Sequence, residues 1–277
     1  MRERSLLSEA SPIFIATVFL ILPVVLLLVF AYKNRAAAED YMDQDSEYAK
    51  AVIEAMRPLR SDVSHSLFPV DFNQPPIFVT WTRQEKVAAY KNEKLPKTTW
   101  VTAVPKLKSF CQGYVRSNGD DLRQLTLRLE QRLGLPPNSG YDTFVELKVD
   151  PTVIKDNFNF FRPCGDPSPI SSTCEPSFPP EPDEIRDSLK ALDPGNSKDV
   201  EKYWLLSKYY WSFAAPEKYP QMKQYPWTSL GYTFDWAPNE EGGENFVRWG
   251  ESEFVVSKGT PVQFVSATDT AKYCTPQ

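Results

Sequence analysis

Histidine is almost absent from this chain of 277 residues, which contains only His65. A histidine-based zinc site and a two-histidine iron site are therefore excluded, and no CxxCH haem-attachment motif occurs. A Ser-His-Asp or Cys-His triad would have to use His65, which lies in a proline-flanked stretch typical of a solvated loop. The GxSxG, HExxH, GxGxxG and Walker A patterns are also missing. We expect no catalytic residue, no metal ligand and no cofactor-binding residue.

Glycine is scarce, and positive charge is not in excess. The 11 glycines stand against 25 prolines, which indicates a loop-rich fold with stiff connections. Lys and Arg number 31 and Asp and Glu 36, so the net charge of -5 argues against nucleic-acid binding through a basic face. A hydrophobic content of 42% and an aromatic content of 13% are too high for a mainly disordered chain.

One long apolar segment is present near the N-terminus. Ile13–Tyr32 is an uncharged run of 20 residues, and a helix of that length covers roughly the 30 Å of bilayer hydrocarbon. The run is longer than the ~7–15 apolar residues of a cleaved signal peptide. Residues 36–38, all alanine, resemble a cleavage site, so removal of the anchor stays an alternative. We expect a cytoplasmic N-terminus over 1–12, a membrane-spanning helix over 13–32, a helical stalk over 33–59, which could also pack on the domain, and a domain over 60–277.

The four cysteines all follow the apolar run. An even number of cysteines is typical of an oxidising compartment, whereas four buried thiols in a cytosolic domain are the alternative. A bridge between Cys164 and Cys174 would close a short loop, and one between Cys111 and Cys274 would hold the C-terminal tail, although the sequence leaves the pairing open. Basic residues flanking the apolar run are nearly balanced. We therefore place the domain in the periplasm or outside the cell mainly because of the cysteines.

Hydrophobic patterning predicts an α+β fold, namely one loop-rich, disulfide-stapled extracytoplasmic domain after the single membrane helix. Strands are indicated by β-branched and aromatic runs, and helices by apolar residues at helical spacing. At the C-terminus, a strand over 230–236 and a hairpin around Lys258 and Gly259 predict an antiparallel β-meander. The other expected strands cover 77–82, 98–104 and 143–149, and the expected helices cover 83–93, 120–133, 183–192 and 197–213.

Aromatic residues are concentrated between Lys202 and Trp227. They fall on more than one side of the predicted helix, so a single buried face cannot absorb them all. Exposed Tyr and Trp are enriched at protein interfaces, which predicts a partner-binding surface, with plain core as the alternative. The candidate partner-binding residues are Trp204, Tyr209, Tyr210, Trp211, Tyr219, Tyr225 and Trp227.

Acidic residues gather late in the chain beside three tryptophans. Such a group could form a glycan-binding cleft, a carboxylate-pair hydrolase or a calcium loop. The alternative is a solvated acidic loop between strands whose aromatic residues form the core. The residues are Asp235, Glu240, Glu241, Glu244, Glu251 and Glu253, with Trp227, Trp236 and Trp249.

These observations favour a non-catalytic, membrane-anchored accessory or scaffold subunit of a larger membrane complex, of a respiratory or photosynthetic type. Its partners would be other protein subunits, contacted through the aromatic residues and the anchor helix. The first alternative is an anchored glycan-binding or carboxylate-based hydrolytic domain. The second is an envelope assembly factor that binds its partners transiently.

Overall fold

The structure is a computed structural model that describes residues 46–55, 60–64, 66–71, 73, 75–150, 152, 159–164, 170–174, 187–193, 197–213, 224–240 and 245–276. The chain divides into two units, Met1–Ser46 and Glu47–Gln277, and the fold of the second unit follows. Within the described residues, no helix is both long enough and apolar enough to cross a membrane. The apolar run Ile13–Tyr32 lies outside them, so the anchor stays a prediction.

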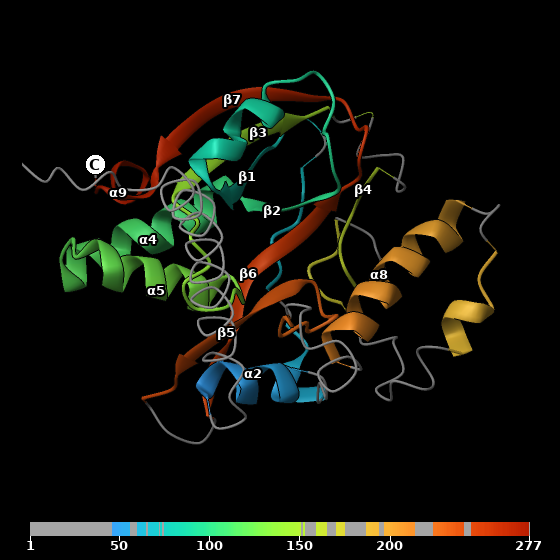
Figure 1. Ribbon diagram of the computed structural model, residues 1–277, viewed down its shortest axis with the longest axis horizontal. Helices are drawn as coiled ribbons and strands as arrows, with labels where there is room; N and C mark the ends of the chain where they lie inside the picture. Colours follow the sequence, from blue (N-terminus) through green and yellow to red (C-terminus); the bar gives the residue numbers. More distant parts are fainter. Residues whose placement is uncertain are drawn as a thin grey trace, which may run out of the picture. The chain divides into compact units, whose positions relative to one another are not determined.

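The centre of this unit is an antiparallel β-sheet (Figure 1). In the described part of the chain the strand order is β4-β6-β2-β1-β3-β7. Strand β5 lies outside this order and pairs with β6, which also pairs with β4. The α+β class and the antiparallel sheet expected from the sequence are confirmed. The strands are β1 (Ile77–Thr82), β2 (Thr99–Ala103), β3 (Thr143–Val149), β4 (Phe160–Phe161), β5 (Tyr232–Pro238), β6 (Phe246–Val256) and β7 (Val262–Asp269).

Helices pack against the sheet: α4 and α5 lie side by side, α4 against β1 and β2 and α5 against β5 (Figure 1). The helix α5 begins where the Asp121 side chain accepts hydrogen bonds from the backbone N–H groups of Arg123 and Gln124. It buries Leu125 and Leu129 against the sheet, as its apolar spacing predicts. The described helices are α2 (Glu47–Ala55), η1 (Arg60–Asp62), η2 (Gln84–Lys86), α3 (Val87–Tyr90), α4 (Val104–Asn118), α5 (Leu122–Arg132), α8 (Ser197–Phe213) and α9 (Thr270–Cys274).

The sheet has an apolar core on each face, because successive side chains of a strand point to opposite sides. In β1, Phe78 packs into one cluster with Phe160 and Phe254. The next residue, Val79, packs into the other cluster, which α4, α5 and α9 cover. Both faces of the central strand β1 are therefore buried.

The expected hairpin around Lys258 and Gly259 is wrong. The strands on either side of it do not pair with each other, since β6 pairs with β2 and β7 pairs with β3 on the far side of β1. The turn is instead held by the loop after α3, where Leu95 exchanges backbone hydrogen bonds with Gly259 and Thr260. The β5–β6 pair is antiparallel, but the C-terminal β-meander does not extend to β7 because the chain crosses to the opposite edge.

The disulfides expected from the cysteine count are present. Cys111 in α4 is joined to Cys274 in α9, with their Cα atoms 5.1 Å apart and a sequence separation of 163 residues. Cys164 is joined to Cys174, with Cα atoms 6.0 Å apart and a separation of 10 residues. We call these the long-range and the short-loop disulfide. The first ties the C-terminal helix to the helical face of the sheet.

The described part of the expected stalk, α2, packs on the sheet unit. Tyr48 is buried, donates a hydrogen bond of 2.9 Å to the Gln224 carbonyl and meets the ring of Trp236 edge-on at 5.5 Å. Val52, one helical turn further on, is buried as well, whereas Ile53 is exposed. The helix therefore presents one apolar face to β5.

Candidate functional site

The aromatic residues of α8 meet a second group of rings from the sheet. Trp204 lies 5.5 Å from Trp100 of β2 and 6.3 Å from Phe161 of β4, measured between ring centroids. Trp227 meets Trp100 edge-on at 4.3 Å. Beneath them Leu205 of α8 is buried. We call Trp100, Trp204 and Trp227 the tryptophan cluster; it joins α8 to the sheet.

The tryptophan cluster is only half covered. Its three side chains are partly exposed, and the neighbouring Tyr203 of α8 is 54% exposed. The Lys208 ammonium lies 5.6 Å from the centre of the Trp204 ring, an arrangement that permits a cation–π interaction. This part of the surface therefore combines aromatic area with positive charge.

The structure places the predicted partner-binding residues in different surroundings. It brings Trp204 and Trp227 together and leaves Tyr210 and Tyr225 half-buried. Trp100, which links the first two, was missed, although its place in an aromatic-rich strand was the available signal. The side chains of Tyr209 and Trp211, and the whole of Tyr219, lie outside the described residues.

Two of the late acidic residues, Asp235 and Glu251, are bound to arginines from distant parts of the chain. The carboxylate of Asp235, which is fully buried, accepts two hydrogen bonds from Arg128, of 3.0 and 2.8 Å, and one of 3.4 Å from Arg132. Glu251 accepts a hydrogen bond of 2.8 Å from the Arg132 Nε. Both guanidinium groups also lie within 4.7 Å of the Phe110 ring centre. This α5 arginine network fastens α5 and α4 to the β5–β6 pair.

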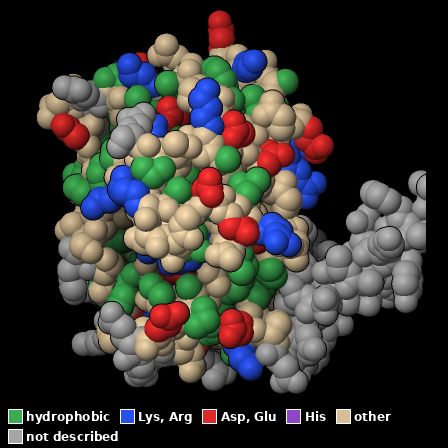
Figure 2. Space-filling model, turned by 90° about the vertical axis from the view of Figure 1, so that its left-hand side faces the viewer, with side chains coloured by type: hydrophobic (Ala, Val, Ile, Leu, Met, Phe, Trp, Pro, Cys, Tyr) green, Lys and Arg blue, Asp and Glu red, His purple; other side chains and the backbone are tan. Residues whose placement is uncertain are grey.

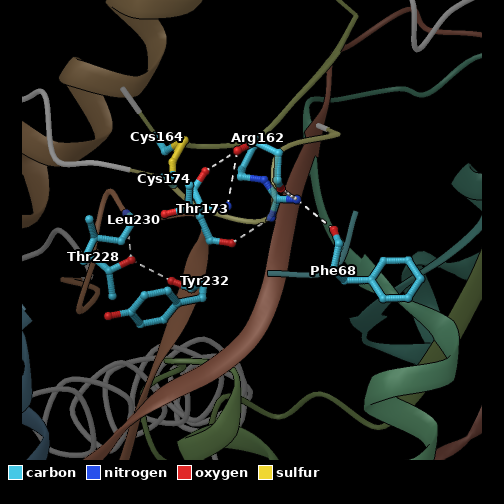
Figure 3. Close-up of a disulfide and its surroundings, with 10 residues drawn as sticks. Phe68, Arg162, Cys164, Thr173, Cys174, Thr228, Leu230 and Tyr232 are labelled. Atoms are coloured by element: carbon cyan, nitrogen blue, oxygen red, sulfur yellow. Dashed lines mark hydrogen bonds between the residues drawn. A yellow bond between two sulfur atoms is a disulfide. The ribbon is translucent and has the colours of Figure 1, made fainter. Parts of the chain in front are cut away.

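A third late acidic residue, Glu253, is buried in the sheet interior near Arg162, whose positive charge influences it. Arg162 is fully buried and donates hydrogen bonds to the backbone carbonyls of Phe68 (2.8 Å), Ser171 (3.2 Å) and Gly231 (3.3 Å) (Figure 3). Its guanidinium lies 4.5 Å from the centre of the Phe254 ring. The guanidinium thus fixes three loops, one of them closed by the short-loop disulfide.

Burial changes the ionisation of this pair. Desolvation raises the pKa of Glu253 to about 8, although the positive charge of Arg162 acts in the opposite direction. Desolvation also lowers the pKa of Arg162 to about 10. The protonated, neutral form of Glu253 is therefore favoured at pH 7.

A further buried arginine connects β6 with the N-terminal segment of the unit. Arg248 binds the carboxylates of Glu54 in α2 and, at 2.8 Å, Asp62. The indole of Trp249 donates to the Asp62 carbonyl at 3.3 Å, while the indole of Trp236 donates to a backbone carbonyl after α5. Asp235, Glu251, Trp236 and Trp249 of the late cluster thus hold elements of the unit together.

The expected alternative of a solvated acidic loop is therefore wrong for Asp235, Glu251 and Glu253, all of which are buried. Glu240 is exposed, and Glu241 and Glu244 lie outside the described residues. Across the described part of the chain, no three His, Cys, Asp or Glu side chains are grouped to hold a metal ion. His65 also lies outside it.

No protein-family model, curated protein or solved structure matches the chain. Its function is therefore inferred from its own sequence and side-chain contacts.

Proposed function

We propose that this protein is a non-catalytic, membrane-anchored accessory or scaffold subunit of a larger membrane complex, of a respiratory or photosynthetic type. Its anchor is the apolar run Ile13–Tyr32, and the sheet unit lies on the periplasmic or extracellular side of the membrane. The contact surface for partner subunits is the tryptophan cluster together with Tyr203. The anchor helix supplies a second contact within the bilayer.

The partial exposure of this aromatic surface is the observation that carries the proposal. Tyr203 is 54% exposed, and the three tryptophans beside it are only half covered. This exposed aromatic area is larger than the packing of α8 on the sheet requires. Large aromatic residues are enriched at the centres of protein interfaces, where they contribute contact area at little cost in conformational entropy. Lys208 adds a positive charge at the rim, which suits a partner surface with acidic side chains.

The buried ion pairs of Asp235 and Glu251 support a structural role for these late acidic residues. The α5 arginine network and the hydrogen bonds of Arg162 to backbone carbonyls join elements that are far apart in sequence. Such links keep the aromatic surface on a fixed framework, which favours binding because little order must be gained on association. A rigid frame that displays aromatic side chains is what a scaffold subunit needs.

The test is gentle detergent extraction from the native host, followed by mass spectrometry of the co-purifying proteins. Wild type is compared with Tyr203→Ala, which removes exposed aromatic area, and with Leu127→Ala in α5, a matched removal of an exposed apolar side chain elsewhere. The proposal predicts that the same membrane proteins accompany wild type and Leu127→Ala and are depleted with Tyr203→Ala. A protein that purifies alone, or partners retained equally by both variants, would contradict it.

A further inference from the structure

One edge of the sheet is long and open within the part of the chain that the structure describes. The strand β7, of eight residues, lies at one end of the strand order and pairs there with β3, and no described strand lies on its outer side (Figure 1). At the other end of the order, β4 has only two residues. A short edge strand offers few free backbone groups, whereas a long one offers a row of them to another chain. The outer side of β7 is therefore the place at which this sheet can be extended.

Hydrogen bonds at the start of β7 show which of its backbone groups face outward. The N–H of Val262 donates to the Glu93 carbonyl at 3.0 Å. Val149, which lies opposite Val262 in β3, donates to Pro76 instead, so the two facing residues point away from each other. Because the direction of the N–H and C=O groups alternates along a strand, Phe264 also points outward. The structure describes no backbone partner for Phe264 on that side.

The end of the strand is oriented by a second hydrogen bond. The N–H of Thr270 donates at 2.8 Å to the carbonyl of Asp142, which directly precedes β3. Asp269 and, two residues earlier, Ala267 therefore point outward. A bulge separates this part from the start of the strand, since Val265 has no residue opposite it in β3. Among the described residues, neither Asp269 nor Ala267 has a backbone partner on the outer side.

The composition of β7 does little to protect this edge. Natural edge strands avoid pairing with other chains through lysines, prolines, inward-pointing charges or bulges. Of these β7 has only the bulge: residues 262–268 include no charged residue and no proline, and Val265 is 42% exposed. Outward-pointing residues lie on both sides of the bulge. An extended chain can therefore reach free N–H and C=O groups along the strand.

The charged residues in contact with β7 divide into two groups of opposite sign. Three lysines and one glutamate contact the first part of the strand and leave +2; they are Lys91, 5.6 Å from the Phe264 ring centre, Lys94, which bridges to Pro261, Lys148, opposite Gln263, and Glu93, bonded to Val262. Three acids and one lysine belong to the second part and leave -2; they are Asp269 itself, Asp142, bonded to Thr270, Glu146, bonded to Ser266, and Lys272, whose N–H donates to Asp269. On the face shown in Figure 2, acidic and basic side chains are interspersed instead.

We propose that β7 is a self-association edge, which pairs in the antiparallel direction with β7 of a second copy of this chain. Antiparallel pairing sets the positive part of each strand against the negative part of the other, whereas parallel pairing would set like charges together. The outward N–H and C=O groups of Phe264, Ala267 and Asp269 gain partners, and the two sheets become one. A twofold contact through one edge closes on itself, so the assembly is a dimer.

The dimer is tested with the full-length chain, purified by itself in detergent. Its mass is measured by native mass spectrometry, and amide hydrogen exchange is followed at low and at high protein concentration. The proposal predicts the mass of two chains at the higher concentration, with slower exchange at the amides of Phe264, Ala267 and Asp269.

Three outcomes of this experiment would overturn the proposal. The first is a single chain at every concentration up to the solubility limit. The second is a dimer in which the three amides exchange as fast as in the single chain, because its interface then lies elsewhere. The third is slow exchange of these amides in the single chain, because another part of the same chain then covers the edge.

A lysine placed on the edge tests which surface pairs. Val265→Lys adds a positive charge at an exposed position of β7, and the twofold symmetry places it in the interface twice, so the Kd of the dimer should rise at least about tenfold. Leu127→Lys in α5 is the matched control, because Leu127 is 43% exposed and lies outside β7. It should leave the Kd unchanged. An equal effect of the two variants, or an unchanged Kd in Val265→Lys, would contradict the proposal.

A charge reversal tests the direction of pairing. Lys94→Glu should raise the Kd about fivefold, because an exposed charge contact that is lost at two symmetry-related positions corresponds to about that ratio. Lys106→Glu changes an exposed lysine of α4 and alters the net charge equally, so it should raise the Kd less. A lower Kd in Lys94→Glu, or the same Kd in both variants, would rule out antiparallel pairing of β7 by charge.

Discussion

Replacement of Asp235 by Asn tests the α5 arginine network most severely. The substitution keeps the size of the side chain but removes the negative charge between Arg128 and Arg132. Loss of one partner of a buried ion pair costs ~3–5 kcal/mol, because the remaining charge stays buried and uncompensated. The side chains of Arg128 and Arg132 are 18% and 20% exposed, so water can reach them in part. We therefore expect the lower end, a loss of about 3 kcal/mol in the free energy of unfolding.

Urea titration of the full-length chain, followed by tryptophan fluorescence at pH 7, measures this loss. Asp187→Asn is the control, because Asp187 pairs with Lys190 at a site where the two side chains are 64% and 67% exposed. Exposed pairs of this kind contribute little, so the control should change the free energy of unfolding by less than about 0.5 kcal/mol. A loss below about 1 kcal/mol for Asp235→Asn would refute the view that this network holds α5 to the β5–β6 pair.

Three further predictions concern other parts of the unit. Since burial raises the pKa of Glu253 from 4.5 to about 8, folding takes up a proton and wild-type stability falls as the pH rises between these values. Glu253→Gln should reduce that fall in urea midpoints measured from pH 5 to 8.5, and an identical fall would contradict the assignment. Cys111→Ser should lower the Tm more than Cys164→Ser, because the two disulfides close separations of 163 and 10 residues, worth about 5 and about 3 kcal/mol in the chain-entropy model; equal losses would be inconsistent with this. Gly231→Ala should cost at least about 2 kcal/mol in thermal unfolding, because φ is +76° and the added Cβ would lie 2.5 Å from the Arg162 Cδ; an unchanged Tm would show that the site relaxes.

Local patterns in the sequence predict several elements well. The β-branched runs at 77–82 and 143–149 coincide with β1 and β3, and the leucine spacing over 120–133 contains α5. The helix α4 was missed, since Pro105 and Gly113 interrupt its apolar pattern and tertiary packing around Leu107 overrides that weak propensity. Strand periodicity identifies a strand but not its partner, which is why β7 was placed beside β6.

The late acidic residues show what the sequence could not provide. Asp235 lies 107 residues from Arg128 in the chain, and only the packing of α5 on β5 brings them together. The same holds for Arg162 and Glu253, whose burial follows from the long-range order of the strands. Local charge patterns therefore predict exposed clusters and miss buried pairs.

We propose that this protein is an anchored subunit of a membrane complex. Native mass spectrometry of the protein, gently solubilised from membranes of its own host, tests that claim most directly. The account predicts that the chain is recovered from the membrane fraction in an assembly well above its own mass of 31.6 kDa. Recovery at the mass of a single chain, or from the soluble fraction, would contradict it.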